Sequence, residues 1–293
     1  MSKLAWDESG KHLYKTGVSH GVIYDVDNSG NYVNGEAWNG LTSFTKSPSG
    51  AEETKLYADN IKYLSLRSAE DFGATIGCYT YPKLFEVKNG SVSPDGIPGM
   101  KIYQQARKTF GLAVQTIIGN DTETNDYGFE LHLCYGMSAS PSEEAYNTVN
   151  ESPEAIEFSY TLSSIPVAVK GYKPTAVVTL DSTAFLDESG VPYEGKKYKQ
   201  EFINLLNVLY GTDSSTADLP TAVSNPTGNP KTKGYYEKTG SATPDVMANY
   251  TLTTDETVDN QKTYYELVTT PGTTARLPLP DEIIEILGGT TAG

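Results

Sequence analysis

The chain has 293 residues and a formal net charge of −15, with 37 Asp and Glu against 22 Lys and Arg. This charge excludes a groove that holds nucleic acid by neutralising phosphates, and the length excludes a mini-protein that depends on disulfide bridges. The 21 Tyr and 27 Gly residues, set among alternating polar and apolar positions, are typical of strands and turns rather than of disorder.

From Val18 to about Ser182, short runs of β-branched and aromatic residues alternate with turn residues. This pattern predicts a mainly β fold, an antiparallel sandwich or barrel. The polar stretch 120–126 predicts a hairpin that pairs the runs on either side of it. The expected strands cover residues 18–26, 32–38, 54–66, 72–81, 110–119, 127–136, 155–162 and 175–180.

Two segments have helical spacing. Apolar residues recur at intervals of three and four between Tyr198 and Leu209, which predicts a helix that lies along the sheet and ends at Gly211. A shorter helix is expected near the C-terminus, where Pro280 can occupy the first turn and Gly288-Gly289 can end it.

Between Leu219 and Arg276 the composition shifts to Thr, Pro, Gly, Asn and Tyr. Residues 219–234 have the composition of an exposed linker. The motif GYYEK at 234–238 is echoed by TYYEL at 263–267, which indicates a small set of hairpins.

Cys78 and Cys134 lie in apolar runs without a CxxC partner, which predicts buried thiols rather than a disulfide or a metal site. A membrane helix needs about 18 apolar residues in a row, and no stretch of the sequence is that long. The first residues contain no apolar core of a signal peptide. We therefore expect synthesis in a cytoplasm and no membrane partner.

The sharpest site motif is a candidate calcium loop formed by Asp25, Asp27 and Ser29 with Glu36 in twelfth place, the spacing of an EF-hand. An EF-hand needs a helix on each side, whereas the flanking residues here are strand-like. The same residue types are typical of a hairpin turn, which the sequence favours over a metal site.

Catalytic motifs are missing from the sequence. The three histidines, His12, His20 and His132, form no HExxH pair, and neither GxSxG nor a common phosphate-binding loop occurs. The carboxylates are dispersed and single out no glycosidase pair. We therefore expect no enzyme and no cofactor.

A set of short motifs spread over residues 38–183 resembles one family. These motifs resemble the major tail proteins of siphophages that infect Gram-positive bacteria, which are the subunits of the tube through which DNA leaves the virion. The motifs are Trp38-Asn-Gly-Leu-Thr42, Ser47-Pro-Ser-Gly-Ala-Glu52, Leu56-Tyr-Ala-Asp-Asn60, Ser68-Ala-Glu-Asp-Phe-Gly-Ala-Thr75, Tyr79-Thr-Tyr-Pro82, Gln104-Gln-Ala-Arg-Lys108, Gly119-Asn-Asp-Thr122, Ala139-Ser-Pro-Ser142, Thr148-Val-Asn-Glu-Ser-Pro-Glu-Ala155 and Asp181-Ser-Thr183.

The resemblance implies a tail-tube-type β-sandwich or barrel with a flanking α-helix. It also implies assembly into hexameric rings that stack into a tube, located in the virion tail after assembly in the host cytoplasm. The implied partners are further copies of the chain, a tape-measure protein in the lumen, and the tail terminator and distal tail proteins. Phage DNA would pass without specific binding, because carboxylates in a lumen repel phosphates.

Two later segments, 209–212 and 276–281, resemble family elements that normally lie close together. Here they are separated by the Tyr-rich segment. We interpret residues 219–275 as a β-rich insertion into a tail-tube domain formed by 1–218 together with 276–293.

Contacts between rings need an arm that reaches the next subunit. The candidate is the segment 43–57, a polar stretch between two strand-like runs, which otherwise reads as an ordinary surface hairpin. Arg107 and Lys108 are a second contact candidate because they form a basic pair in an acidic chain, although a solvated turn explains them equally well. The arm candidates are Ser43, Lys46, Pro48, Gly50, Glu52, Glu53 and Tyr57.

Two competing functions remain open at this point. The many tyrosines and the C-terminal hairpins are compatible with a carbohydrate-binding or adhesin β module of a virion or cell surface. A glycoside hydrolase would need two carboxylates at a fixed separation, each essential for activity.

Overall fold

The computed structural model describes residues 6–50, 52–97, 99–146, 148, 155–241 and 245–290. The chain divides into two compact units, a main unit of residues 1–210 with 274–293 and a small unit of residues 211–273. The small unit starts at 211 rather than at the predicted 219, because residues 212–216 already pair with residues 269–273, and it ends at 273 rather than at 275. Most of the motif at 148–155 lies outside the described residues.

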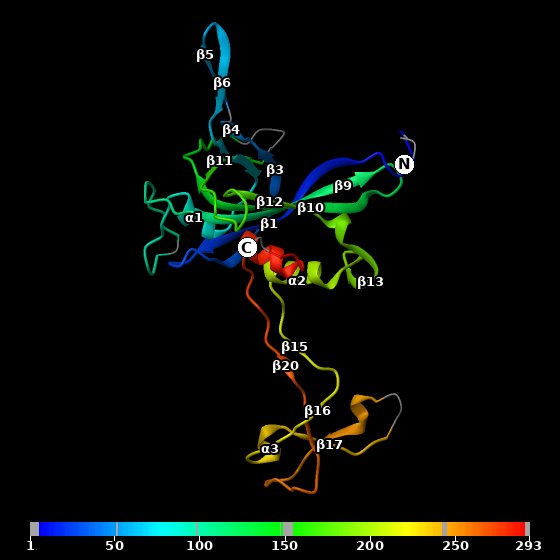
Figure 1. The fold of residues 1–293 in the computed structure, drawn as a ribbon. Coiled ribbons are helices and arrows are strands. Elements are labelled where there is room, and N and C mark those ends of the chain that lie inside the picture. The colour runs from blue at the N-terminus through cyan, green and yellow to red at the C-terminus, as the bar shows by residue number, and fades with distance from the viewer. Residues whose placement is uncertain are drawn as a thin grey trace. The chain divides into compact units, whose positions relative to one another are not determined.

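An antiparallel sheet of eight strands forms the main unit (Figure 1), so the predicted mainly β class is confirmed. The strand order is β2-β1-β9-β10-β11-β8-β3, with β12 paired beside β10. In the described residues this path starts at β2 and ends at β3 without closing, so the barrel alternative is wrong. The strands are β1 (Tyr14–Val26), β2 (Tyr32–Trp38), β3 (Leu41–Lys46), β8 (Gly73–Cys78), β9 (Phe110–Asn120), β10 (Thr124–Ala139), β11 (Phe158–Ser164) and β12 (Val177–Asp181).

Strand β10 explains how the sheet bends. It pairs with β12 through residues 130–134 and with β11 through residues 137–139. Between these ladders its register against β9 shifts, and Gly136 adopts a positive φ of 57°. A Cβ on Gly136 would lie 2.2 Å from the carbonyl oxygen of Ile165, so only glycine fits this close approach.

Both faces of the sheet are buried, which gives the main unit two cores. Along β10, Leu131 and Leu133 face the first core, and Cys134 faces the second. The first core is covered by α2 (Gln200–Tyr210), α4 (Pro280–Ile286) and the hairpin of β13 (Leu186–Tyr193) and β14 (Lys196–Tyr198), which follows the short helix η1 (Ser182–Phe185). The second contains α1 (Lys83–Lys88), whose Phe85 is fully buried.

The predicted buried thiols are confirmed. Cys78 and Cys134 are free and fully buried in the second core. Burial raises the pKa of Cys78 to about 11 and that of Cys134 to about 12. Both side chains therefore stay protonated and act as small apolar groups.

The two predicted helices are confirmed with small shifts of their ends. Helix α2 starts at Gln200 rather than Tyr198 and ends before Gly211, whose φ is +77°. Helix α4 is followed by Gly288 and Gly289, whose N–H groups donate to the carbonyls of Glu285 and Ile284 at 3.0 and 2.8 Å.

The small unit contains a four-stranded sheet of order β16-β19-β17-β18. The echoed motifs are neighbouring strands in it, because Tyr236 pairs with Tyr265 and Glu237 with Tyr264. The linker prediction for 219–234 is wrong, since that segment supplies β16 and α3. The elements are β15 (Ser215–Thr216), β16 (Thr221–Ala222), α3 (Pro230–Lys233), β17 (Tyr236–Lys238), η2 (Met247–Asn249), β18 (Tyr250–Leu252), β19 (Tyr264–Glu266) and β20 (Thr269–Thr270).

Candidate assembly interface

A two-stranded hairpin leaves the main sheet after β3. The chain passes through β4 (Ser49–Gly50), forms the hairpin of β5 (Glu53–Ala58) and β6 (Ile61–Arg67), and returns through β7 (Glu70–Asp71), which pairs with β4. Strands β5 and β6 pair only with each other in the described chain, and Figure 1 shows them extending beyond the sheet. We call residues 53–67 the arm hairpin.

The prediction of one strand over 54–66 is wrong, because the chain reverses at Asp59 and Asn60. Their φ angles are +51° and +62°, the left-handed conformations that a type I′ turn requires of both central residues. Asp and Asn tolerate this region better than other non-glycine residues. The Asp-Asn pair was therefore the sequence signal for the turn.

The arm hairpin has one charged face and one apolar face. On the charged face the Lys62 ammonium lies 2.6 Å from a Glu53 carboxylate oxygen, which also accepts a hydrogen bond from the Ser65 hydroxyl. On the other face Leu56 pairs with Leu64, directly beside Leu66 and Ile61. The exposed fractions of Leu56, Ile61, Leu64 and Leu66 are 42, 64, 45 and 51%.

This exposure makes the apolar face a candidate contact surface. An isolated two-stranded hairpin is marginally stable in water at best, and neighbouring exposed apolar side chains on a soluble protein mark interaction sites. Tyr57, which is paired with Lys62 on the charged face, and Tyr63 are also exposed, at 68 and 72%. The geometry therefore favours an arm that is covered when the chain meets a partner.

The structure places the predicted arm residues in three different settings. Ser43 and Lys46 belong to β3, paired with Gly77 and Ala74 of the main sheet, so their inclusion in an arm is wrong. Gly50 lies in β4 at the base of the hairpin. The exposed residues Pro48 and Glu52 connect these short strands, and Glu53 and Tyr57 lie in β5. The predicted arm segment 43–57 therefore includes most of β5 and omits β6.

The hairpin turn that the sequence favours is present and the calcium-loop alternative is wrong, because two of its carboxylates bind opposite ends of α1 and the third binds its own turn. Asp25 forms an ion pair with the buried ammonium of Lys88. Asp27 accepts backbone hydrogen bonds of the turn between β1 and β2, and Glu36 accepts those of Lys83 and Leu84 at the start of α1, at 3.3 and 3.0 Å. Within the described residues, no three His, Cys, Asp or Glu side chains are grouped as a metal site.

The basic pair stands directly before β9. Arg107 and Lys108 are both exposed, and the Arg107 side chain lies against Gly90. Lys108 is close enough to Asp25 to be one of the charges that lower the pKa of that carboxyl. Arg107 forms no ion pair with a carboxylate of the described residues.

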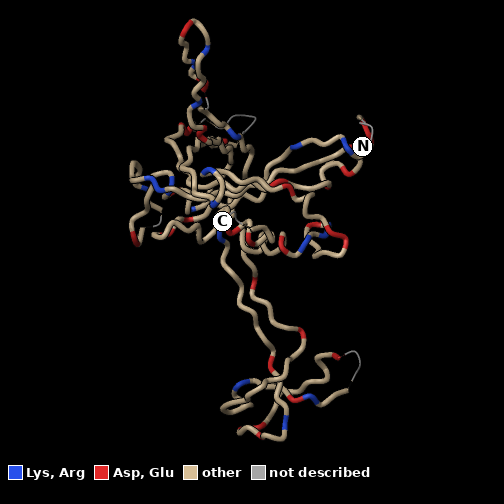
Figure 2. The backbone as a smooth tube through the Cα atoms, viewed as in Figure 1, with Lys and Arg blue, Asp and Glu red and all other residues tan. Residues whose placement is uncertain are grey.

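Charged residues are scattered over both units. Figure 2 shows Asp and Glu on nearly every part of the chain rather than in one patch. No helix in the described ranges has the length and apolar character needed to cross a membrane.

No protein-family model matches the chain, and no curated protein matches it at a significant level.

Proposed function

We propose that the chain is a structural subunit that assembles through the arm hairpin into the stacked rings of a phage tail tube. The observation that carries the proposal is the uncovered apolar face of the arm hairpin, formed by Leu56, Ile61, Leu64 and Leu66. The sequence motifs that resemble siphophage major tail proteins support a tail tube as the type of assembly.

The arm hairpin suits a contact between unlike surfaces. It protrudes from one side of the main sheet, so its apolar face meets a different surface on the next copy. Repeated contacts of this heterologous kind close into a ring or continue as a filament, and a stacked tube combines both. In the proposal, six copies form each ring and the arm hairpin lies on a subunit of the adjacent ring.

Net charge supports a role as a passive channel. With a formal charge of −15 per subunit, a ring of copies repels phosphates over short distances even in physiological salt. In the proposal the lumen encloses a tape-measure protein and later lets DNA pass, and the chain has no catalytic step. The tail terminator and distal tail proteins would contact the two ends of the tube.

A paired substitution tests the role of the arm hairpin. We expect Leu56→Gln with Leu64→Gln to abolish tubes seen by electron microscopy of the concentrated protein, because it makes the apolar face polar. Thermal unfolding should stay nearly unchanged, since both side chains are about half exposed in the single chain.

The matched control lies on the opposite face of the same two strands. Lys55→Gln with Ser65→Gln changes a directly paired position of the charged face and should leave the tubes intact. Normal tubes from the Leu56 and Leu64 variant would contradict the proposal, as would a wild-type chain that stays monomeric at every concentration and with its tail partners.

One observation favours a carbohydrate-binding module as a second candidate function. Tyr236, Tyr250 and Tyr265 share one face of the small sheet, where the rings of Tyr250 and Tyr265 are 5.2 Å apart and Leu252 is 57% exposed. Aromatic rings on a flat face can stack on sugar rings. This candidate predicts glycan binding that does not require tubes.

A further inference from the structure

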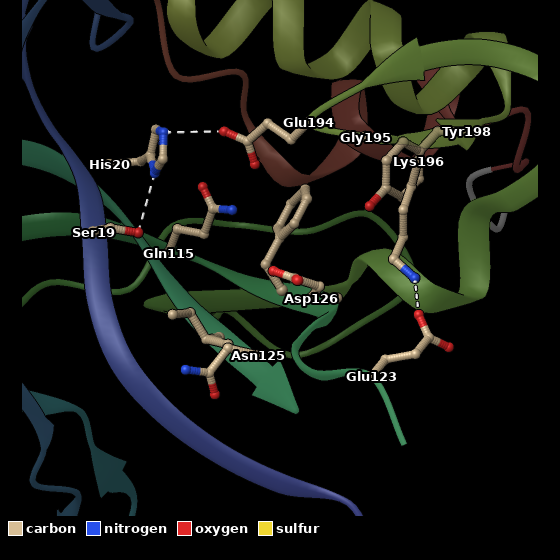
Figure 3. Close-up of a pocket in the computed structure, with 13 residues that line it drawn as sticks. Ser19, His20, Gln115, Glu123, Asn125, Asp126, Glu194, Gly195, Lys196 and Tyr198 are labelled. Atoms are coloured by element: carbon tan, nitrogen blue, oxygen red, sulfur yellow. Dashed lines mark hydrogen bonds and ion pairs between the residues drawn. The ribbon is translucent and has the colours of Figure 1, made fainter. Parts of the chain in front are cut away.

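A cleft of about 640 Å³ opens in the main unit beside the turn between β9 and β10 (Figure 3). It lies between the hairpin end of β9 and β10, strand β1 and the turn that joins β13 to β14. All of the residues that line it belong to the main unit. Its volume is in the range of sites that hold a ligand or a large side chain.

The cleft has an apolar floor and an acidic rim. The floor is formed by Ile117, Phe129 and Tyr198. Three carboxylates line the cleft and face a single lysine, Lys196, whose ammonium lies 2.5 Å from a Glu123 oxygen. The other two carboxylates belong to Asp126 and Glu194, and His20 Nε2 lies 3.3 Å from Glu194.

Gln115, which lines the cleft, has a side-chain oxygen that no donor of the described chain reaches. Its side chain is 4% exposed and its Oε1 atom has no hydrogen-bond partner. In Figure 3 the amide points into the cleft, between His20 and Glu194. A buried oxygen without a donor is costly, so a group that enters the cleft and donates to Gln115 gains this hydrogen bond in addition to its charge interactions.

A guanidinium group fits this arrangement best. It carries five N–H donors in a planar fork, so one side can reach an amide oxygen while the other binds a carboxylate. The same plane stacks on aromatic rings such as those of Phe129 and Tyr198. An ammonium group offers the charge without the planar stacking.

The chain itself contains a suitable arginine. Of its three arginines, Arg276 is bound to Glu282 on both nitrogens, whereas Arg67 and Arg107 have no carboxylate partner in the described residues. Arg107 lies three residues before the start of β9, whereas Gln115 stands in the middle of the strand and Ile117 in its second half. At about 3.4 Å per residue, the eight residues from Arg107 to Gln115 span about 27 Å.

We propose that the cleft of one copy binds the guanidinium of Arg107 from a second copy. The donor precedes β9 and the acceptor lies about 27 Å further along, toward the β9–β10 turn, so the contact joins two different surfaces head-to-tail and can repeat around a ring. The inference rests on the proposed function for the presence of neighbouring copies, and it identifies the side-to-side contact within a ring.

A charge exchange tests the pair. Arg107→Glu and Glu194→Arg alone should each raise the concentration needed for assembly by about 30-fold or more, because each leaves like charges facing in the contact. The double variant should recover most of the loss. Arg67→Glu is the matched control on the other unpaired arginine. Recovery of Glu194→Arg by Arg67→Glu instead of Arg107→Glu would overturn the assignment.

A disulfide trap gives an independent readout. We expect the double variant Arg107→Cys with Asp126→Cys to form a ladder of covalent oligomers under oxidation, since each copy supplies both ends. The native Cys78 and Cys134 are buried and free. The single variants should form no ladder. A product that stops at the dimer would show a symmetric contact and overturn the head-to-tail arrangement.

The two experiments separate the inference from the function. Wild-type tubes together with no ladder and no charge rescue would overturn the cleft contact and leave the tail-tube proposal standing. A ladder with charge rescue from a chain that never forms tubes would support the contact and contradict the tube. A chain with neither ladder nor tubes would contradict both.

Discussion

His132 shows how the fold changes the chemistry of a single residue. It lies in β10 with 3% of its surface exposed, and its Nε2 atom is 2.9 Å from the Thr116 hydroxyl. Burial, followed by the nearby ammonium of Lys46, lowers the pKa of the imidazole to about 4, although Glu130 opposes the shift. The ring is therefore neutral in the folded chain at neutral pH.

This pKa predicts a loss of stability in mild acid. In the unfolded chain His132 binds a proton with an ordinary pKa of about 6.5. The stability that the folded chain gains from a neutral His132 is therefore complete above that pH and is lost as the pH falls toward about 4. When the pH falls from about 7 to about 4.5, we expect the unfolding free energy of both proteins to decrease. The decrease should be larger in the wild type than in His132→Gln by about 2 to 3 kcal/mol. Denaturant unfolding at the two pH values measures it, and parallel curves would contradict it.

The predictions for single residues were right where neighbouring residues determine the environment of a side chain. They were wrong where residues distant in the sequence determine it. The apolar neighbours of Cys134 already predicted a buried thiol. Glu36 instead binds backbone groups of α1, almost fifty residues away, and a spacing motif carries no information about such a partner. The unpartnered oxygen of Gln115 depends on the packing of three elements, so the sequence contains no signal for it.

At the scale of elements, α2 was predictable because its apolar positions repeat over the whole helix. Phe202, Leu205 and Leu209 are all fully buried against the sheet. The arm hairpin was harder, because its strands have exposed apolar residues on one face and no core of the same chain to specify their register. In the proposed function, the alternation there marks the surface that meets the next copy.

Burial predicts a contrast in stability between two positions on α2. Leu205→Ala should lower the unfolding free energy by about 2 to 5 kcal/mol, because it leaves a cavity at a position with no exposed surface. Asn207→Ala, on the exposed side of the same helix, should change it by about 0.5 kcal/mol or less. Calorimetry of the two variants measures the difference, and equal melting temperatures would show that α2 is not part of the core.

At the scale of the molecule, composition found the small unit but not its limits. The segments that flank the small unit meet in the fold, since the Arg276 N–H donates to the Val208 carbonyl at 2.9 Å. The boundary was misplaced because residues 212–216 and 269–273 have loop-like composition and yet pair as a ladder. Pairing between segments about sixty residues apart is invisible to local patterns.

The same ladder predicts that the small unit can be removed. Thr212 and Thr273 exchange both backbone hydrogen bonds at 3.0 Å, so their Cα atoms are about 5.5 Å apart and a two-residue Asn-Gly turn can replace residues 213–272. Neither core of the main unit contains a residue of the removed segment. We expect the shortened chain to keep its melting temperature within a few degrees and to form tubes, as seen by electron microscopy. If the second candidate function holds, glycan binding is lost while the tubes remain. Failure of the shortened chain to fold would show that the small unit supports the main one and that residues 211–273 are not a separable insertion.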